Sequence, residues 1–532
     1  MTEPEFQSLA REGYNRIPLI AESIADLDTP LSLYLKLAHA HTPSQTAAER
    51  GGARVGVNAG VNAGANSFLL ESVIGGERFG RYSFIGLPAR TAIRARGFGA
   101  DAITEVVTDG AVVESQAGNP LDIIAAFQTR FSVAVRPGLP RFSGGLAGYF
   151  GYDVARHIEP RLIEHARRAA SDDGFDIPDI LLLLTEELAV VDNLAGKIYL
   201  IVYADPATHD AHGRAKARLS ELRERLRRPV DVPYSQPSMR TESHREFSRE
   251  DYLAAVGNAK QLIAAGDVMQ VQIGQRIVKP FRDSPLTLYR ALRSLNPSPY
   301  MYFYNFGNFH VVGASPEILV RQETRPRADG ASGNDTIVTI RPLAGTRPRG
   351  ATPEHDAALA RELLADPKEI AEHVMLIDLA RNDIGRIAEI GSVVVTDQLI
   401  VEKYSHVMHI VSAVEGKLKA GLSSLDVLKA TFPAGTLTGA PKVRAMEIID
   451  ALEPARRGLY GGACGYLSFS GEMDLAIAIR TGIIKDGMLA VQAAAGIVAD
   501  SIPENEWQET ENKARAVLRA AEQVQEGLDG GI

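Results

Sequence analysis

Short apolar runs between turn-forming residues recur from about residue 67 to residue 203, which is the pattern of β-strands. The plainest of these runs are 67–70, 144–152 and 181–184. A helix-like stretch, 30–40, precedes them, and a charged stretch with helical character, 209–228, follows them. Residues 229–240 are rich in proline and serine, so we expect a linker there.

Longer helices separate the strands of the second half. The pattern predicts helices at 249–265, 353–388 and 504–526, and one more between Pro441 and Pro454. The helix at 353–388 carries apolar residues at helical spacing: Leu359, Leu363, Ile370, Val374, Ile377 and Ala380. Strands are expected at 268–278, 300–306, 309–314, 392–401, 407–415, 473–484 and 488–494. Because the strands and helices do not alternate as β–α–β units, we expect an α+β fold.

The chain of 532 residues is longer than one compact core usually serves, so we expect two domains or one large elaborated domain. The composition shifts divide it into residues 1–205, a charged helix and linker at 206–244, and residues 245–525. Residues 42–66 contain a near-repeat of Gly, Val, Asn and Ala, which offers little side chain to bury. This segment is therefore predicted to be a flexible surface loop.

Charge and cysteine content narrow the class of protein. The net charge is −9 with no offsetting basic block, which speaks against nucleic acid or an acidic membrane surface as a partner. The single cysteine, Cys464, excludes a disulfide framework and a cysteine-based metal cluster. No apolar run approaches the roughly 20 residues of a membrane helix, and the first 17 residues lack the apolar core of a signal peptide. We therefore expect a cytoplasmic protein.

Two pairs of glutamates stand at a spacing of three residues, which places both members of a pair on one helix face. They are Glu369 with Glu372, and Glu506 with Glu509. Two such pairs could hold one Mg²⁺, which takes a few carboxylates and leaves positions for water and substrate. Spacing alone favours two solvated helix faces instead. His373 is expected to pack rather than to bind metal, because neither zinc-protease helix motif is present.

Three further features suggest chemistry less directly. Residues 432–442 resemble a phosphate loop, but Gly-Ala-Pro-Lys replaces the Walker Gly-Lys-Ser/Thr, so we reject nucleotide binding. Cys464 lies between strand-like segments without a nearby base, which favours an inert buried thiol over a nucleophile. Arg480 ends an alternating apolar run, where it could capture a substrate carboxylate or form a structural ion pair.

Several ordered blocks together resemble the chorismate-utilising enzymes, and specifically the large subunit (component I) of anthranilate synthase. The resemblance covers about residues 30–520, and its blocks are Leu-Leu-Glu-Ser (69–72), Gly-Arg-Tyr-Ser-Phe-Ile-Gly (80–86), Asn-Pro-Ser-Pro-Tyr-Met-Tyr-Phe (296–303), Ser-Pro-Glu (315–317), Arg-Pro-Leu-Ala-Gly-Thr-Arg (341–347), the helix segment 372–383, the turn 435–442 and Asn-Lys-Ala-Arg (512–515). It implies two packed antiparallel sheets that form a large sandwich with helices outside. It also makes residues 245–525 the chorismate-binding catalytic domain.

The resemblance implies a set of site residues. Chorismate would bind through Mg²⁺ held by Glu372 and Glu509, with Glu369 and Glu506 as secondary or water-mediated ligands. Tyr460 and Arg480 would bind the enolpyruvyl carboxylate, and further substrate contacts would come from Gly345, Thr346, Ala494, Ala495 and Gly496. The family's Gly-Ala-Gly reads Ala-Ala-Gly here, which position 494 should tolerate if only its backbone is used and its φ is negative.

The reaction implied is the addition of ammonia at C2 of chorismate with loss of the C4 hydroxyl, followed by elimination of pyruvate. It requires a general acid and a base. His409 and Thr436 match positions beside the ring, and we hypothesise that His409 and Glu317 are among the residues that share the acid and base roles. Mg²⁺ would withdraw electron density through the carboxylate. Ala344 stands where aminodeoxychorismate synthases often carry a nucleophilic Lys, so we expect direct addition through an aminodeoxyisochorismate intermediate.

The resemblance extends to regulation and partners. Ser72, Pro299, Tyr300 and Met301 match a tryptophan feedback site, although packing between two sheets would also explain them. Ammonia would come from a separate glutamine amidotransferase subunit (component II), in a heterotetramer of two large and two small subunits. The alternatives are aminodeoxychorismate synthase, which Ala344 opposes, a catalytically inactive tryptophan sensor, and a metal-dependent hydrolase, which lacks a zinc-type ligand set.

Overall fold

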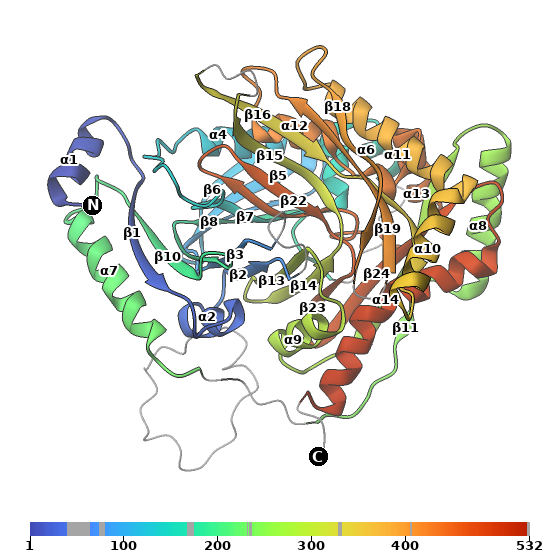
Figure 1. The fold of residues 1–532 in the computed structure, drawn as a ribbon, viewed down its shortest axis with the longest axis horizontal. Helices are drawn as coiled ribbons and strands as arrows, with labels where there is room; N and C mark the ends of the chain where they lie inside the picture. Colours follow the sequence, from blue (N-terminus) through green and yellow to red (C-terminus); the bar gives the residue numbers. More distant parts are fainter. Residues whose placement is uncertain are drawn as a thin grey trace.

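The structure is a computed structural model that describes residues 1–39, 64–73, 80–166, 175–230, 232, 237–327, 332–404 and 407–528. Two large antiparallel β-sheets form its centre (Figure 1). Residues 42–63 of the predicted flexible loop lie outside the described ranges. In the part of the chain that the structure describes, no helix combines the length and the apolar character needed to cross a membrane.

The first sheet has 12 strands among the described residues. Its order is β1 (Ile17–Ile24), β10 (Lys197–Ala204), β9 (Glu187–Asp192), β3 (Tyr82–Gly86), β2 (Ser67–Glu71), β13 (Tyr300–Asn305), β14 (Phe309–Ser315), β23 (Thr481–Lys485), β24 (Met488–Ile497), β12 (Gln270–Pro280) and β11 (His244–Arg245). The short strand β20 (Gly439–Ala440) also pairs with β12.

The second sheet also has 12 strands among the described residues. Its order is β17 (Leu343–Pro348), β19 (Val407–Lys417), β16 (Asn334–Ile340), β15 (Ile318–Pro326), β22 (Met473–Ile477), β21 (Ala463–Ser468), β7 (Gly145–Phe150), β8 (Ile180–Thr185), β4 (Thr91–Arg96), β5 (Ile103–Thr108) and β6 (Ala111–Ala117), with β18 (Val394–Lys403) beside β19. Each sheet thus combines strands from before and after the segment 206–244.

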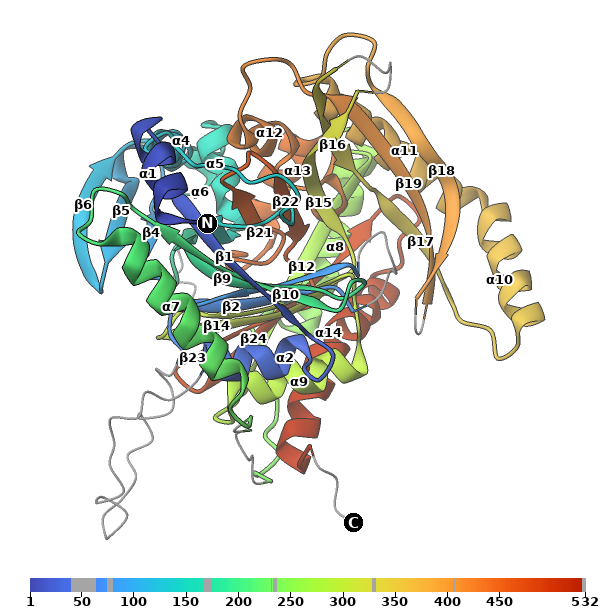
Figure 2. The same ribbon diagram turned by 60° about the vertical axis from the view of Figure 1, so that its left-hand side comes forward.

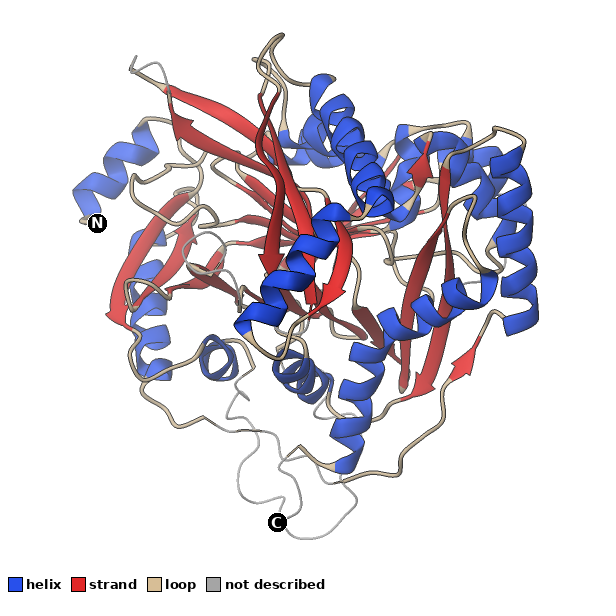
Figure 3. Ribbon diagram, turned by 45° about the vertical axis from the view of Figure 1, so that its right-hand side comes forward, coloured by secondary structure: helices blue, strands red, loops and turns tan. Residues whose placement is uncertain are grey.

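Helices lie around the outside of the two sheets (Figure 3). In chain order they are α1 (Glu3–Arg11), α2 (Pro30–Leu37), α4 (Pro120–Gln128), α5 (Ala155–Ile158), α6 (Leu162–Ala166), α7 (Ala211–Leu226), α8 (Arg249–Ala264), α9 (Pro285–Leu295), α10 (Pro353–Ala365), α11 (Pro367–Gly385), α12 (Ser424–Thr431), α13 (Lys442–Leu452) and α14 (Pro503–Glu526). Figure 2 shows β17–β19 with α10 and α11 at one end of the molecule and β4–β6 at the other.

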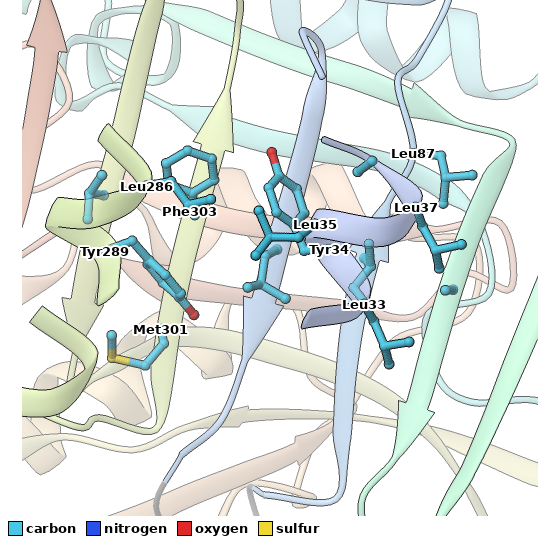
Figure 4. Packing of buried hydrophobic residues seen from close by; sticks show 14 of the residues in the cluster. Leu33, Tyr34, Leu35, Leu37, Leu87, Leu286, Tyr289, Met301 and Phe303 are labelled. Carbon is cyan, nitrogen blue, oxygen red and sulfur yellow. The ribbon is translucent and has the colours of Figure 1, made fainter. Parts of the chain in front are cut away.

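Three apolar layers hold this arrangement together. An aromatic core between the sheets contains Tyr302 and Tyr304 of β13 and Tyr466 of β21. The outer face of the first sheet packs against α2, α7, α9 and α14, with Tyr34 and Phe303 in contact (Figure 4). The outer face of the second sheet packs against α4, α11, α12 and α13. The predicted α+β sandwich of two antiparallel sheets is confirmed.

Two predicted elements are wrong in their extent. The single helix expected at 353–388 is two helices, α10 and α11, because Pro367 cannot continue a hydrogen-bonded helix and Asp366 caps the second one. The single strand expected at 473–484 is two strands, β22 and β23, in different sheets. The chain crosses between the sheets at residues 478–480, where Arg480 has a φ of 52°.

Candidate active site

The first glutamate pair lies on α11, which packs against β17 and β19 (Figure 2). Both side chains are half-buried. Arg347 lies 3.5 Å from Glu369, and the Gln270 side-chain amide donates a hydrogen bond of 3.2 Å to Glu372. Burial raises the pKa of Glu369 and the negative charge of Glu372 raises it further, whereas Arg347 lowers it. The two carboxylates therefore repel each other in a place that water does not fully screen, which favours a bound cation.

The second pair lies in the first turns of α14. Burial raises the pKa of Glu506, a hydrogen bond with Ser501 lowers it, and the charge of Glu509 raises it. Glu509 forms an ion pair of 2.6 Å with Lys513, one turn further along the helix. Lys513 also donates a hydrogen bond of 2.9 Å to the carbonyl of Ala494. This lysine ties the second glutamate pair to strand β24.

Glycines bring the strands close to these carboxylates. A Cβ atom at Gly345 would lie 3.2 Å from a carboxylate oxygen of Glu369, and one at Gly496 would lie 2.6 Å from the amide nitrogen of Gln270. Gln270 in turn holds Glu372. Gly345 also has a φ of 78°, which favours glycine at this position. The glycines of β17 and β24 therefore lie at the edge of the α11 carboxylate pair.

The carboxylates suit a hard divalent cation, and they would supply only part of its coordination shell. Within the described ranges, no three histidine, cysteine or acidic side chains gather closely enough to hold a metal ion. Mg²⁺ is commonly held by one or two carboxylates and completes its shell with water and substrate oxygens. The half-buried pair on α11, together with the buried Glu506 and the exposed Glu509 on α14, fits that mode of binding.

Strand β24 offers its backbone at the predicted substrate positions. Ala494, Ala495 and Gly496 lie opposite Gly274, Ile273 and Gln272 of β12. Ala494 is not among the described residues with a positive φ, so an alanine fits there without strain. Of the two conditions stated for the Ala-Ala-Gly variant, the negative φ at position 494 is met.

Arg480 is a cation with no carboxylate partner among the residues that the structure describes. Within the described residues, no acidic side chain lies within ion-pair distance of its guanidinium, so the structural ion pair that the sequence left open does not form there. Burial lowers the pKa of Arg480, and the neighbouring Tyr460 acts in the opposite direction. The side chain keeps partial exposure, so an anion could reach it. An incoming carboxylate would therefore supply the missing counter-charge.

His409 lies on β19 beside the Gly-Thr segment of β17. Its Nδ1 atom is 3.0 Å from the hydroxyl of Thr346 and 3.2 Å from the carbonyl oxygen of Gly345. Burial lowers the pKa of His409 to about 4, and the charge of Arg480 contributes in the same direction. The ring is therefore neutral at pH 7, and a proton on Nδ1 that is donated to Gly345 leaves Nε2 as a proton acceptor.

Glu317 is the most strongly perturbed carboxyl group of the site. It is buried where the chain passes from β14 to β15, and burial raises its pKa to about 8. The hydroxyl of Thr436, in the turn 435–437, donates a hydrogen bond of 3.1 Å to it. This hydrogen bond and the charge of Lys513 lower the pKa. At pH 7 the group is mostly protonated, as a general acid must be.

The four residues matched to an inhibitor site line one pocket. Ser72, Pro299, Tyr300 and Met301 surround about 580 Å³ of space free of protein atoms, open solvent at its mouth included. The Tyr300 hydroxyl donates a hydrogen bond of 3.0 Å to Asp474 in its wall. The pocket lies between the two sheets, because β2 and β13 belong to the first sheet and β21 and β22 to the second.

Two smaller predictions about inert residues are confirmed. Cys464 is buried on β21, and burial raises the pKa of its thiol, so the reactive thiolate is disfavoured. His373 is fully buried and packs against β19 with a hydrogen bond of 2.8 Å to Ser412.

Sequence reasoning missed three residues that the structure places in the site. Lys513 contacts Glu509 and Ala494, and Gln270 contacts Glu372. The ring of Tyr404 lies edge-on to His409 at 5.5 Å. Lys513 could have been found, because it stands four residues after Glu509 on one helix face. Gln270 and Tyr404 carry no such local signal.

Comparison with known proteins agrees with this geometry. The family described as chorismate binding enzyme matches residues 90–519. The chain is 54% identical over 529 residues to anthranilate synthase component 1 of Neisseria meningitidis serogroup A, a match that covers 99% of this chain and 100% of that protein. It is 52% identical over 536 residues to anthranilate synthase component 1 of Pseudomonas aeruginosa, with 99% and 100% covered.

A solved structure supports the same relationship. Anthranilate synthase component I from Streptococcus pneumoniae superimposes with a TM-score of 0.69 at 37% identity, over 84% of this chain and 94% of that one. The chain therefore belongs to the family of chorismate-binding enzymes, among the component 1 subunits of anthranilate synthase.

Proposed function

We propose that the chain is the chorismate-aminating subunit of anthranilate synthase and acts in the cytoplasm. It converts chorismate and ammonia into anthranilate and pyruvate, the first committed step of tryptophan biosynthesis. The observation that carries this proposal is the presence in one candidate site of a buried, protonated Glu317 and of an Arg480 that has no carboxylate partner within the described residues. These two residues supply an acid for a departing hydroxyl and a cation for a substrate carboxylate.

Substrate binding follows from the charges of the site. We assign the enolpyruvyl carboxylate of chorismate to Arg480 and Tyr460, and the ring to the backbone of residues 494–496 with Gly345 and Thr346. Glu372 and Glu509 would hold Mg²⁺ directly, with Glu369 and Glu506 joined through water. When bound, the metal ion would withdraw electron density from the ring through its carboxylate.

The acid and base roles follow from the protonation states. Glu317 is protonated and donates its proton to the C4 hydroxyl as that group leaves, while ammonia adds at C2. The product of this step is the aminodeoxyisochorismate intermediate. Thr436 holds the Glu317 carboxyl in place through its hydrogen bond. Neutral His409 then accepts the C2 proton as the C3–O bond to the enolpyruvyl group breaks, which makes the ring aromatic. The enolpyruvate released takes up a proton on its methylene carbon and becomes pyruvate.

The source of the nitrogen distinguishes this reaction from its nearest relatives. Ala344 lies on β17 and carries no nucleophile, which supports direct addition of ammonia. Cys464 is buried between strands, which leaves the chain without an accessible thiol for glutamine hydrolysis. We therefore propose a separate glutamine amidotransferase subunit as the ammonia source, in a heterotetramer of two large and two small subunits.

The pocket between the sheets is proposed to bind tryptophan as a feedback inhibitor. Its wall combines apolar side chains, such as Met301, with the ion pair of Arg321 and Asp474 at 2.8 Å. An amino acid with a large apolar side chain matches this combination of apolar and charged groups. Ser72, Pro299 and Tyr300 would complete the contacts.

One assay with a matched variant tests the proposal. The purified chain with chorismate, MgCl₂ and an ammonium salt should form anthranilate, which is followed by its fluorescence. Glu317→Gln should reduce kcat by about 100-fold or more, because a positioned general acid typically contributes 10²–10⁴-fold. A wild-type chain that forms no anthranilate, or a Glu317→Gln variant with full turnover, would contradict the assignment.

A further inference from the structure

A buried ion pair joins Glu453 to Arg457, just after α13. Their closest atoms are 2.7 Å apart, and both side chains are at most 3% exposed. A second hydrogen bond of 3.0 Å makes the contact bidentate. Buried pairs of this kind contribute little net stability, because taking both charges out of water offsets their attraction. Their geometric effect on neighbouring groups therefore matters more than their contribution to folding.

The Arg457 guanidinium also donates to two backbone carbonyls. One is that of Leu437 at 2.6 Å, which is the residue after Thr436. The other is that of Gln272 on β12, at 3.2 Å. Arg457 thus fixes the turn that carries the hydrogen-bond partner of Glu317 and, on the other side, the strand that pairs with β24.

Glu453 completes the connection to β24. Its carboxylate accepts a hydrogen bond of 2.7 Å from the backbone NH of Gly274. A Cβ atom at Gly274 would lie 3.1 Å from that carboxylate, so glycine leaves room for the contact. Gly274 lies directly opposite Ala494 in the sheet, whose backbone we assigned to the substrate.

The planar face of the guanidinium lies near two tyrosine rings. It is 4.7 Å from the centroid of Tyr152 and 5.6 Å from that of Tyr460. Lysine could reproduce the charge but neither the planar contact nor the several simultaneous hydrogen bonds. Arg457 therefore contacts the Tyr460 ring and also donates hydrogen bonds to the turn that carries Thr436 and to strand β12, which pairs with β24.

We propose that Arg457, held by Glu453, is a positioning residue for chorismate, because it fixes Tyr460, the Thr436 turn and the backbone of Ala494 relative to one another. This inference rests on the proposed function, since it takes those three groups to be parts of the chorismate site. Arg457 acts through these groups and does not itself contact the substrate.

The test exchanges Arg457 for Lys and compares it with a matched pair elsewhere. Arg156 forms an ion pair with Asp450 of α13 at 2.7 Å, with both side chains at most 9% exposed, and lies 5.6 Å from the ring of Phe98. Its guanidinium donates hydrogen bonds to Asp153, Leu162 and Asp450, none of which belongs to the proposed chorismate site. Both exchanges keep the charge and lose the planar fork, so both should lower Tm to a similar extent.

The substrate kinetics should separate the two variants. With ammonium as the nitrogen source, Arg457→Lys should raise the KM for chorismate about tenfold and lower kcat, whereas Arg156→Lys should keep KM within twofold of the wild type. Equal KM values for the two variants would overturn the proposal, because they would show a structural role alone. Turnover by the wild type in the same experiment tests the proposed function separately.

A charge-neutral double variant guards against misfolding. Arg457→Met with Glu453→Gln removes both charges together, so no unpaired buried charge remains. If this protein shows a cooperative thermal transition, its affinity for chorismate, measured by calorimetry without ammonia, should fall at least tenfold. An unchanged affinity in the folded double variant would contradict the proposal.

Discussion

Replacing Thr436 with valine should raise the pKa of Glu317 and move the alkaline limit of the reaction. The threonine hydroxyl donates a hydrogen bond of 3.1 Å to the Glu317 carboxyl, and this contact lowers a pKa that burial raises to about 8. A hydrogen bond to a charged group contributes about 1.5–3 kcal/mol, and the protonated carboxyl retains part of it. A net loss of about 1.4 kcal/mol corresponds to a rise of about one pKa unit.

The assay is the pH dependence of kcat/KM for chorismate with ammonium salts, calculated per concentration of unprotonated ammonia. The wild-type rate should fall above pH about 8, as Glu317 loses the proton that it donates. In Thr436→Val the midpoint of this fall should lie about one unit higher, whatever happens to the maximal rate. The midpoint, unlike the rate, reports the protonation of the acid directly.

Thr438→Val is the matched control. Thr438 lies in the same turn and is fully buried, but its hydroxyl donates to the carbonyl of Ala434 at 3.0 Å and not to a carboxyl group. In Thr438→Val, the midpoint of the alkaline fall in kcat/KM should equal that of the wild type. A midpoint that stays constant or falls in Thr436→Val would refute the identification of Glu317 as the acid.

Three further predictions address stability, substrate binding and regulation. Because the folded-state pKa of Glu317 is raised, the wild type loses stability as the pH rises from about 4.5 to about 8. The difference in Tm between Glu317→Gln and the wild type should therefore shift in favour of the variant between pH 5 and pH 9. A difference in Tm that stays constant over this range would argue against a buried ionisable carboxyl group. Arg480→Gln removes a cation that has no carboxylate partner within the described ranges, and it should raise the KM for chorismate about 10–100-fold in steady-state assays, the equivalent of about 1.5–3 kcal/mol. An unchanged KM would place the substrate carboxylate elsewhere. Ser72→Leu fills part of the pocket between the sheets, so half-inhibition should require at least tenfold more tryptophan. The KM for chorismate should change much less. A variant as sensitive to tryptophan as the wild type would show that the inhibitor binds elsewhere.

The sequence identified most elements of the fold because their signals are local. Strand runs such as 300–306 and helices such as 504–526 lie within a few residues of the observed β13 and α14. The two errors of extent have different causes. Pro367 was a visible helix boundary, whereas the break at Arg480 depends on a left-handed residue that only the crossing between two sheets requires.

Some features of the candidate site also follow from local sequence, whereas others depend on how distant segments pack. Spacing placed Glu369 and Glu372 on one face of a helix, but only the structure shows that Gln270 of a distant strand holds the second carboxylate. The raised pKa of Glu317 comes from burial at the junction of the two sheets, which the short motif Ser-Pro-Glu does not encode. Protonation states and unpaired charges are properties of the packed molecule, so they could not be read from residue types.

The central claim is that this chain aminates chorismate but cannot release ammonia from glutamine. The most direct measurement incubates the purified chain with chorismate and MgCl₂, once with an ammonium salt and once with glutamine, and follows anthranilate by fluorescence and mass. We expect anthranilate with the ammonium salt, and with glutamine only after a glutamine amidotransferase subunit is added. Aminodeoxychorismate as the product, or glutamine-dependent turnover by the chain alone, would contradict the claim.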